Sequence, residues 1–301
     1  MPDPAPPPHP GIAGSAAVVY GILANLLLAL IKGAAGVLGH SYALIADAIE
    51  SLADVLTSAI VWFGLRAAAR GPDQDHPYGH GKAEPIAALA VSLMLAAAAV
   101  LIAVQSVRQI RTPHEAPAGF TLLVLLGVIL VKELLYRYLH RIGRELQSGA
   151  LQADAWHHRG DALTSLAAGI GISVALIGGP AYAAADDWAA LAAAGLIAWN
   201  AARIFLPAFN ELMDRAPADV WIASVCDTAA AVDGVMLIER CQIRKMGFDY
   251  FADLHVHVDG NLSVREGHII AGKVKSRIRQ AYPRVRNVLI HIEPAQSGTD
   301  G

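Results

Sequence analysis

The chain has 301 residues, of which 55% are hydrophobic and only 16% are charged, and its mean hydropathy is +0.43. The apolar share is higher and the charged share lower than in an average soluble protein, so the composition favours a membrane protein. The net charge of -3 is spread along the chain and argues against nucleic acid as a partner, and the two cysteines, Cys226 and Cys241, form neither a disulfide framework nor a thiolate metal motif.

Long apolar runs follow one another through the first two thirds of the chain. The N-terminus is rich in proline and lacks the basic start of a signal peptide, so we expect residues 1–12 to be disordered. Each apolar run that follows is close to the roughly 20 residues that span a bilayer. They predict a transport domain over residues 13–208 with six transmembrane helices, at 13–37, 42–67, 84–107, 119–140, 150–178 and 184–206.

The basic residues between these runs predict the orientation in the membrane. The loops at 38–41 and 179–187 contain no Lys or Arg, whereas the connections at 66–82 and 137–149 contain several. Because cytoplasmic loops carry an excess of Lys and Arg, these two connections are predicted to be cytoplasmic. Two arginines in the loop at 108–118 are a weaker signal in the opposite direction. With six spans, both termini would then be cytoplasmic, in a multi-pass protein of the cell (inner) membrane.

Residues 209–295 have a different pattern, with short segments and alternating apolar residues, and residues 296–301 are expected to be a disordered tail. Asp253, His255 and His257 alternate with apolar neighbours at a period of two, which is typical of a strand. Ser263 and Glu266 form the capping-box pattern of a helix start. The order helix, strand, strand, helix, strand suits a small α+β domain with its helices on one sheet face. The expected elements are 220–232, 235–245, 250–258, 263–281 and 285–292, with a turn at Gly247.

An acidic phrase occurs in both the second and the fifth apolar run. A charge at the centre of a bilayer costs on the order of 3 kcal/mol, so such residues are rare there. A step of four or seven residues returns to nearly the same face of a helix. The phrase therefore predicts two stripes, Asp47, Glu50 and Asp54 on one helix and Asp154, His157 and Asp161 on the other. Helix caps would be a simpler explanation of one acid, but the duplication favours two facing stripes that bind a divalent cation.

Four phrases of the sequence resemble the cation diffusion facilitator (cation efflux) family, and the resemblance extends from Gly21 to Pro294. The phrases are Leu44–Ser58, Asp75–Glu84, Ala153–Ser165, and Leu254–His268 with His291–Pro294. The resemblance implies a homodimer in the lipid bilayer, with six membrane helices and a cytoplasmic ferredoxin-like domain of α-β-β-α-β order. It also implies a transporter, not an enzyme, that exchanges cytoplasmic divalent metal for protons.

The resemblance also implies a transport site with two residues from the second helix and two from the fifth, Glu50, Asp54, His157 and Asp161. The spacing alone leaves His158 as an alternative to His157, because it lies three residues from Asp161, and the resemblance favours His157. Glu50 stands where Asp or His is commonest in the family, and its longer side chain changes the size of the cavity. The candidates for supporting or cavity-lining groups are Asp47, Asp154 and His158.

Two further metal sites are implied outside the membrane helices. The loop residues Asp73, His76 and His80 match a second site of some family members, although loop histidines are often only solvated. In the C-terminal domain a regulatory metal could be held by residues that would otherwise be structural. These candidates are Glu239, His255, His257, His268, His291 and Glu293.

The expected function is proton-coupled efflux of a divalent metal. The ligands must be deprotonated to bind metal, so protons compete for the same groups and a separate proton site is not needed. One histidine with three carboxylates suits zinc, which we expect first, and also iron(II), manganese and cadmium. The alternatives are a membrane metalloenzyme, which needs an open coordination position and a general base, and a membrane-bound metal sensor without transport.

Overall fold

The computed structural model describes residues 9–38, 42–111, 121–178 and 185–295, and the side chains of some helical residues, including Asp47 and Glu50, lie outside the described part. The chain divides into two compact units, Met1–Phe209 and Asn210–Gly301. This division falls one residue beyond the boundary expected from the change in sequence pattern.

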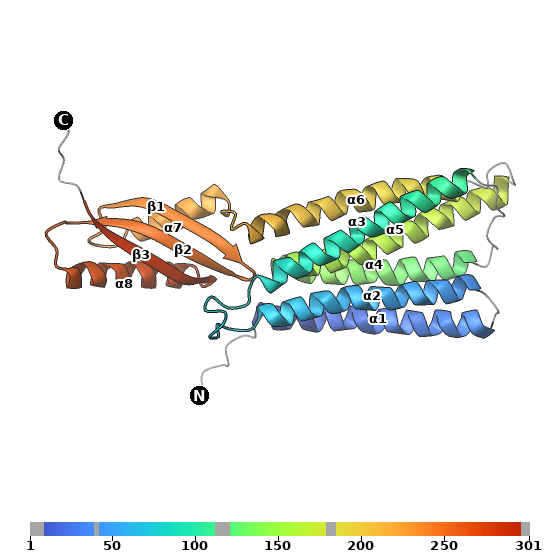
Figure 1. Cartoon of the computed structure of the whole chain (residues 1–301), viewed down its shortest axis with the longest axis horizontal. Coiled ribbons are helices and arrows are strands. Elements are labelled where there is room, and N and C mark those ends of the chain that lie inside the picture. Colours follow the sequence, from blue (N-terminus) through green and yellow to red (C-terminus); the bar gives the residue numbers. More distant parts are fainter. Residues whose placement is uncertain (1–8, 39–41, 112–120, 179–184, 296–301) are drawn as a thin grey trace. The chain divides into compact units, whose positions relative to one another are not determined.

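The described residues of the first unit form long helices that run side by side (Figure 1). These are α1 (Pro10–Leu38), α2 (Tyr42–Ala68), α3 (Ala83–Arg111), α4 (Thr121–Glu145), α5 (Gly149–Gly178) and α6 (Ala185–Leu212). α1 packs along α2, and α4 packs along α5. α2 and α5, which carry the two acidic phrases, also contact each other, so the fold brings the two halves of the predicted site together.

Small residues allow the helices of the first unit to approach closely. A Cβ atom added to Gly64 of α2 would lie 2.4 Å from the Cβ of Ala87 of α3. Gly160 of α5 faces Ile197 of α6 and Leu95 of α3. Between apolar helices in a bilayer, close packing of this kind replaces the hydrophobic effect as a source of association.

The apolar character of these helices is uneven. Within the described part of the chain, three helices are long and apolar enough to cross a membrane, over Pro10–Ile31, Ala83–Arg108 and Leu191–Leu212. The sequence predicted six membrane spans, and the length and composition of the helices support three of them. The other three helices are of similar length, but α2, α4 and α5 carry charged residues in their interiors, among them Asp54, Lys132 and Asp161.

Several helix ends differ from the prediction. α1 begins at Pro10, inside the segment 1–12 that was expected to be disordered, because a proline is tolerated in the first turn of a helix. α6 continues through Pro207 to Leu212, beyond the predicted end at 206. The remaining residues for which disorder was predicted, 1–8 and 296–301, lie outside the described part of the chain.

The second unit has the predicted order of elements, α7 (Asp219–Ala230), β1 (Leu237–Met246), β2 (Asp249–Val258), α8 (Val264–Ala281) and β3 (Val285–Pro294). β1 pairs antiparallel with β2 through a turn at Gly247, whose φ of 64° suits glycine. β3 lies parallel to β2 on its other side, and α8 makes the crossover. The predicted capping box is present, because Ser263 and Glu266 each accept a hydrogen bond from the backbone N–H of the other.

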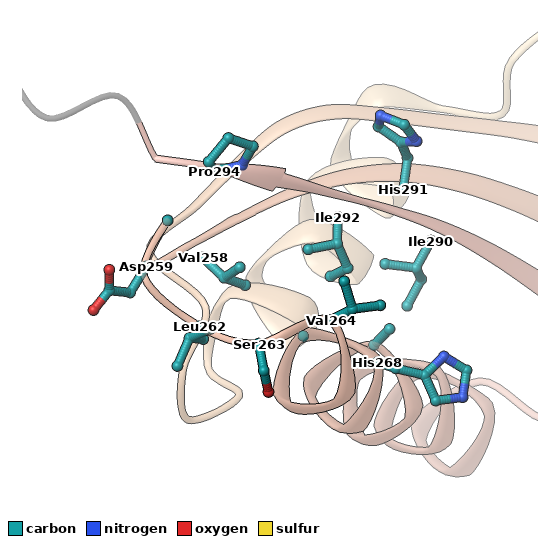
Figure 2. Close-up of a pocket in the computed structure, with 13 residues that line it drawn as sticks. Val258, Asp259, Leu262, Ser263, Val264, His268, Ile290, His291, Ile292 and Pro294 are labelled. Carbon is teal, nitrogen blue, oxygen red and sulfur yellow. The ribbon is translucent and has the colours of Figure 1, made fainter.

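Alternation along the strands separates an apolar face from a polar one. Leu254 and Val256 of β2 are buried against helix residues such as Val225 of α7 and Val274 of α8. Figure 2 shows the same alternation on β3, where Ile290 and Ile292 point towards α8 and His291 points away from it. The opposite face of the sheet is therefore left to the histidines and acids of the odd-numbered positions.

Candidate metal centre

Asp54 of α2 and His157 and Asp161 of α5 come together inside the first unit. One ligand atom from each lies within 4.8 Å of the others. His157 Nε2 is 3.1 Å from Asp54 Oδ1 and 3.9 Å from Asp161 Oδ2. Asp54 is buried, with 6% of its surface exposed. Three of the four residues predicted to form the transport site are thus brought together from segments about a hundred residues apart.

The fourth predicted ligand, Glu50, and the supporting residue Asp47 lie on α2, with side chains outside the described part. Glu50 stands four residues before Asp54, a spacing at which two helical residues share a face. The role of Glu50 therefore remains a proposal based on its position in the helix.

Lys132 of α4 is a member of this cluster that the sequence analysis missed. Its Nζ donates hydrogen bonds to Asp54 Oδ2 at 2.5 Å and to Asp161 Oδ2 at 2.8 Å, and only 2% of its side chain is exposed. A lysine in the middle of the apolar run 119–140 was visible in the sequence. A buried charge in a membrane is energetically costly, and this argument, which identified the acidic residues, also identifies Lys132 as a functional candidate.

The structure distinguishes the two adjacent histidines. His157 faces the acids, whereas His158 is fully buried on another side of α5, near Gly21 of α1, where an added Cβ would lie 3.3 Å from His158 Nε2. Neither ring nitrogen of His158 has a hydrogen-bond partner among the described residues. His157 is therefore the histidine that the fold brings to Asp54 and Asp161.

Asp154, predicted as a supporting group, is fully buried one turn before His157 on α5. Its Oδ1 accepts a hydrogen bond of 2.8 Å from the hydroxyl of Ser58 on α2. Its Oδ2 has no hydrogen-bond partner within the described part of the chain. Asp154 therefore links the two acid-bearing helices while keeping one oxygen available.

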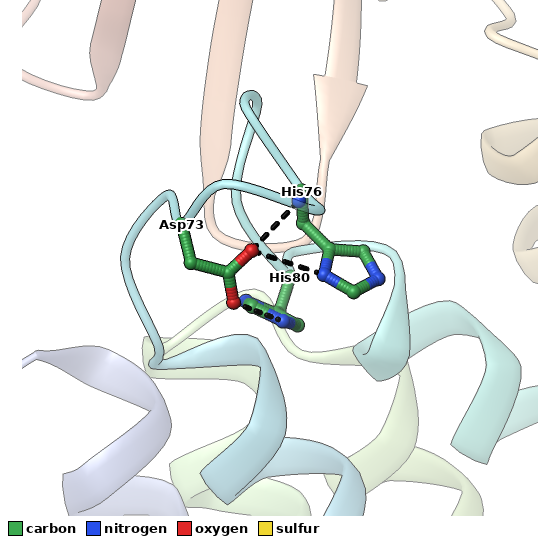
Figure 3. A group of neighbouring side chains, drawn as sticks. All are labelled: Asp73, His76 and His80. Atoms are coloured by element: carbon green, nitrogen blue, oxygen red, sulfur yellow. Dashed lines mark hydrogen bonds and ion pairs between the residues drawn. The ribbon is translucent and has the colours of Figure 1, made fainter.

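The loop between α2 and α3 gathers Asp73, His76 and His80 (Figure 3). Asp73 Oδ1 accepts from the backbone N–H of His76 at 2.7 Å and lies 3.2 Å from its Nδ1. The backbone hydrogen bond from His76, with a further contribution from the His76 side chain, holds the pKa of Asp73 below its usual value. Asp73 Oδ2 lies 3.3 Å from His80 Nε2. The three predicted loop residues thus form one exposed cluster.

The polar face of the sheet gathers five of the six predicted residues of the C-terminal domain. His255 Nδ1 is 2.6 Å from Glu293 Oε1, and His257 Nε2 is 3.3 Å from Glu293 Oε2. Partial burial opposes ionisation of Glu293, but its hydrogen bonds with His255 and Glu239 outweigh this effect and hold the pKa of Glu293 below its usual value. Glu239 lies 3.5 Å from His257, and His291 lies 3.4 Å from Glu293.

His268 does not join this group. It lies on α8, beside a hollow of about 480 Å³ that is lined by residues of α8, of β3 and of the segment 258–263 before α8 (Figure 2). His291 of β3 lines the same hollow. Because α8 covers the apolar face of the sheet, His268 is separated from His255 and His257 by the sheet itself. Sequence patterning could place each histidine on an element but could not assign the elements to opposite sides.

Comparison with known proteins covers both units. Residues 18–213 match the family model of the cation efflux transmembrane domain, and residues 217–295 match that of the cation efflux protein, cytoplasmic domain. The manganese efflux system protein MneP of Bacillus subtilis is 34% identical over 277 residues, which cover 91% of this chain and 93% of that protein. The magnetosome protein MamB of Magnetospirillum gryphiswaldense is 30% identical over 279 residues, covering 92% of this chain and 93% of that protein.

Among solved structures, the nickel form of a variant of the MamM C-terminal domain is similar to part of the chain. It is 20% identical, and the match covers 26% of this chain and 100% of that one, with a TM-score of 0.26. The family matches, by contrast, extend over almost the whole sequence. The chain therefore belongs to the cation diffusion facilitator (cation efflux) family, whose members are transporters of divalent metal cations and not enzymes.

Proposed function

We propose that the chain exports a divalent metal in exchange for protons and carries it at Asp54, His157 and Asp161, with Glu50 as the fourth ligand. The observation that supports this most is the convergence of two carboxylates and an imidazole, from α2 and α5, within 4.8 Å in the interior of the helical unit. Zn²⁺ and similar dications bind such atoms at about 2.0–2.2 Å, so modest closure of the cluster would complete the coordination.

The exposed surface of the helical unit supports a position within the bilayer. α4 presents large apolar side chains at intervals of three or four residues along its outer side, at Leu123, Leu126, Leu130 and Leu134. Asp54 of α2, Lys132 of α4 and Asp161 of α5 meet inside the unit. Apolar outside and charged inside is the arrangement expected of helices that surround an ion pathway in a membrane. We propose that all six helices cross the cell membrane and that both termini are cytoplasmic.

Exchange for protons follows from the chemistry of the ligands. Carboxylates and imidazole bind a metal only when deprotonated, so the site releases protons as it loads and takes them up as it empties. If the site opens to the two sides of the membrane in turn, outward release of metal is coupled to inward movement of protons. Asp54 and Asp161, with Glu50, offer up to three negative charges, enough to offset a dication.

For the metal itself, we propose manganese ahead of zinc and iron(II). Three carboxylates and one imidazole form an oxygen-rich set of the kind that suits manganese, although zinc and iron accept it as well. The similarity to a manganese efflux protein, MneP, points the same way. The sequence alone had favoured zinc, because imidazole and carboxylate together are common zinc ligands.

We propose that the two outer clusters bind regulatory metal and that the second unit forms a homodimer. In the loop, His80 Nδ1 lies 3.2 Å from the carbonyl oxygen of Gly71, which can only accept a hydrogen bond. With its proton on Nδ1, a neutral His80 turns a lone pair of Nε2 towards Asp73 Oδ2, an arrangement that a cation between them would stabilise. On the sheet, Glu239, His257 and Glu293 offer a second set of three ligands.

The experiment for the transport proposal is flux across sealed proteoliposomes, measured for manganese, zinc, iron(II) and cadmium, with a pH indicator trapped inside. We expect wild-type protein to move metal and protons in opposite directions, and Asp54→Asn and Asp161→Asn to abolish flux while leaving the protein folded. Asp233→Asn, an identical change at an exposed position of the second unit, is the control and should transport normally. Normal flux in either site variant would refute the proposed ligands.

The regulatory proposal has its own readout. His257→Ala should lower flux at low metal concentration and leave it unchanged at saturation, because a regulatory metal shifts a conformational equilibrium without carrying the substrate. A wild-type concentration dependence would show that His257 is structural, and complete loss of flux would place it on the transport path.

A further inference from the structure

Lys132 occupies a position in the transport cluster that no ligand role explains. Its ammonium group lies between the carboxylates of Asp54 and Asp161, which come from two different helices. The neighbouring residue on α4, Glu133, points outwards and pairs with Arg137 near the surface. Lys132 is thus the cation that joins α2, α4 and α5 at the site.

The ammonium group and a metal ion cannot use the same oxygens together. Nζ is 2.5 Å from Asp54 Oδ2 and 2.8 Å from Asp161 Oδ2. A metal ion bound by these two oxygens would lie about 2.0–2.2 Å from each, and so in nearly the same place as the ammonium group. Two positive charges at that separation repel strongly inside a protein, where screening is weak. Binding of a metal ion by these two oxygens therefore requires Lys132 to leave.

Asp154 offers the displaced ammonium group of Lys132 a second position. It is fully buried, one turn before His157, and its Oδ1 is held by the hydroxyl of Ser58. Its Oδ2 has no hydrogen-bond partner among the described residues, which is costly for a buried carboxylate. Asp154 already interacts electrostatically with Lys132, and the four-carbon stem of a lysine is flexible.

We infer that Lys132 is a tethered counter-cation, which pairs with Asp54 and Asp161 when the site holds no metal and moves to Asp154 when metal binds. The inference rests on the proposed transport site and adds a moving part to it. The tethered charge lowers metal affinity, since each arriving ion must displace it, and this favours release on the far side. It also offsets part of the negative charge of Asp54 and Asp161 when the empty site returns.

The test is equilibrium binding of Mn²⁺ to the purified full-length protein in detergent, following only the binding component that Asp161→Ala removes. Lys132→Met deletes the charge but keeps the length of the side chain. Because this change removes a cation that is hydrogen-bonded to both carboxylates and competes with the metal, metal affinity should rise by about tenfold or more. Lys132→Arg keeps the charge and should bind Mn²⁺ less tightly than Lys132→Met.

Asp154→Asn tests the second position. It should lower Mn²⁺ affinity, because the displaced ammonium loses its acceptor, and it should have no effect once Lys132→Met is present. A loss of Mn²⁺ affinity that disappears in the Lys132→Met background shows that Asp154 acts through the ammonium group of Lys132. If Asp154 instead only supported the site through Ser58, the loss would be the same in both backgrounds.

The outcomes separate the inference from the transport proposal. If the Asp161-dependent component exists but Lys132→Met binds no tighter than wild type, or Asp154→Asn costs the same in both backgrounds, the tethered cation is wrong and the transport site stands. If wild type has no such component, the site itself is wrong. Gel filtration confirms folding, and Lys132→Gln replaces Lys132→Met in the comparison should the latter aggregate.

Discussion

Glu84 joins the start of α3 to the start of α5 and lends itself to a quantitative prediction. It is almost fully buried, with 1% exposed, and one of its oxygens, Oε1, accepts two hydrogen bonds of 2.8 Å. The donors are the hydroxyl of Ser148, which precedes α5, and the backbone N–H of Ala150 in its first turn, and both residues are fully buried. The carboxylate also lies at the helix N-terminus, where a negative charge is favourable.

The cost of Glu84→Ala follows from these contacts. Leaving two buried donors without an acceptor costs about 1–3 kcal/mol each. The lost charge at the helix N-terminus adds about 0.3–1 kcal/mol. We expect Glu84→Ala to lower the free energy of unfolding by about 2–7 kcal/mol. Glu84→Gln keeps an oxygen that can accept both hydrogen bonds and loses only the charge, so it should cost about 1 kcal/mol.

The measurement is unfolding of the purified protein in mixed micelles by titration with a denaturing detergent, followed by circular dichroism. Glu145→Ala is the matched control, because Glu145 pairs with Arg141 on the exposed surface of α4. An exposed ion pair contributes about 0–1 kcal/mol, so that variant should be close to wild type. Equal losses for Glu84→Ala and Glu84→Gln, or a loss for Glu84→Ala no larger than for the control, would refute the reasoning.

Three further predictions concern packing, electrostatics and metal choice. Gly64→Ala should destabilise the helical unit by about 1–3 kcal/mol, since its Cβ would collide with α3, whereas Gly127→Ala, which meets nothing within 4 Å, should be neutral in the same unfolding assay. His255→Ala should raise the pKa of Glu293 towards its ordinary value, because the first of the hydrogen bonds that depress it is removed, and a carboxyl ¹³C NMR titration that finds the pKa unchanged would contradict this. Glu50→His should shift the ratio of zinc to manganese flux towards zinc, since imidazole is the softer ligand; an unaltered ratio would mean that Glu50 does not touch the metal.

Much of the helical unit could be predicted because membrane helices have a simple length requirement. Each of the six apolar runs contains a helix whose ends lie within about six residues of the prediction. The ends were less accurate where the sequence gives conflicting signals. The change of sequence pattern suggested that the last helix ended at 206, yet the helix continues through Pro207 to Leu212. A proline inside a helix is costly but not forbidden when the surrounding packing holds.

The site was predictable within a helix but not between helices. Spacing of four and seven residues identified the stripes on α2 and α5, because such residues share a face. Spacing could not decide between His157 and His158, which the structure separates by about 100° around α5. Lys132 was missed because it belongs to neither copy of the acidic phrase, and its partners lie 78 and 29 residues away. For the same reason His268 was grouped with histidines on the far side of the sheet.

The charges inside α2, α4 and α5 have a consequence for the way the chain enters the membrane. A segment with a lone lysine or aspartate at its centre loses on the order of 3 kcal/mol on insertion. α4 and α5 are separated by only three residues, from Leu146 to Ser148, so they can insert together as a hairpin with Lys132 and Asp161 already paired. α2 is synthesised earlier and keeps Asp54 without that lysine until α4 is made. If all six helices cross the membrane, as proposed, we expect a nascent chain that stops before α5 to hold α4 in the bilayer poorly.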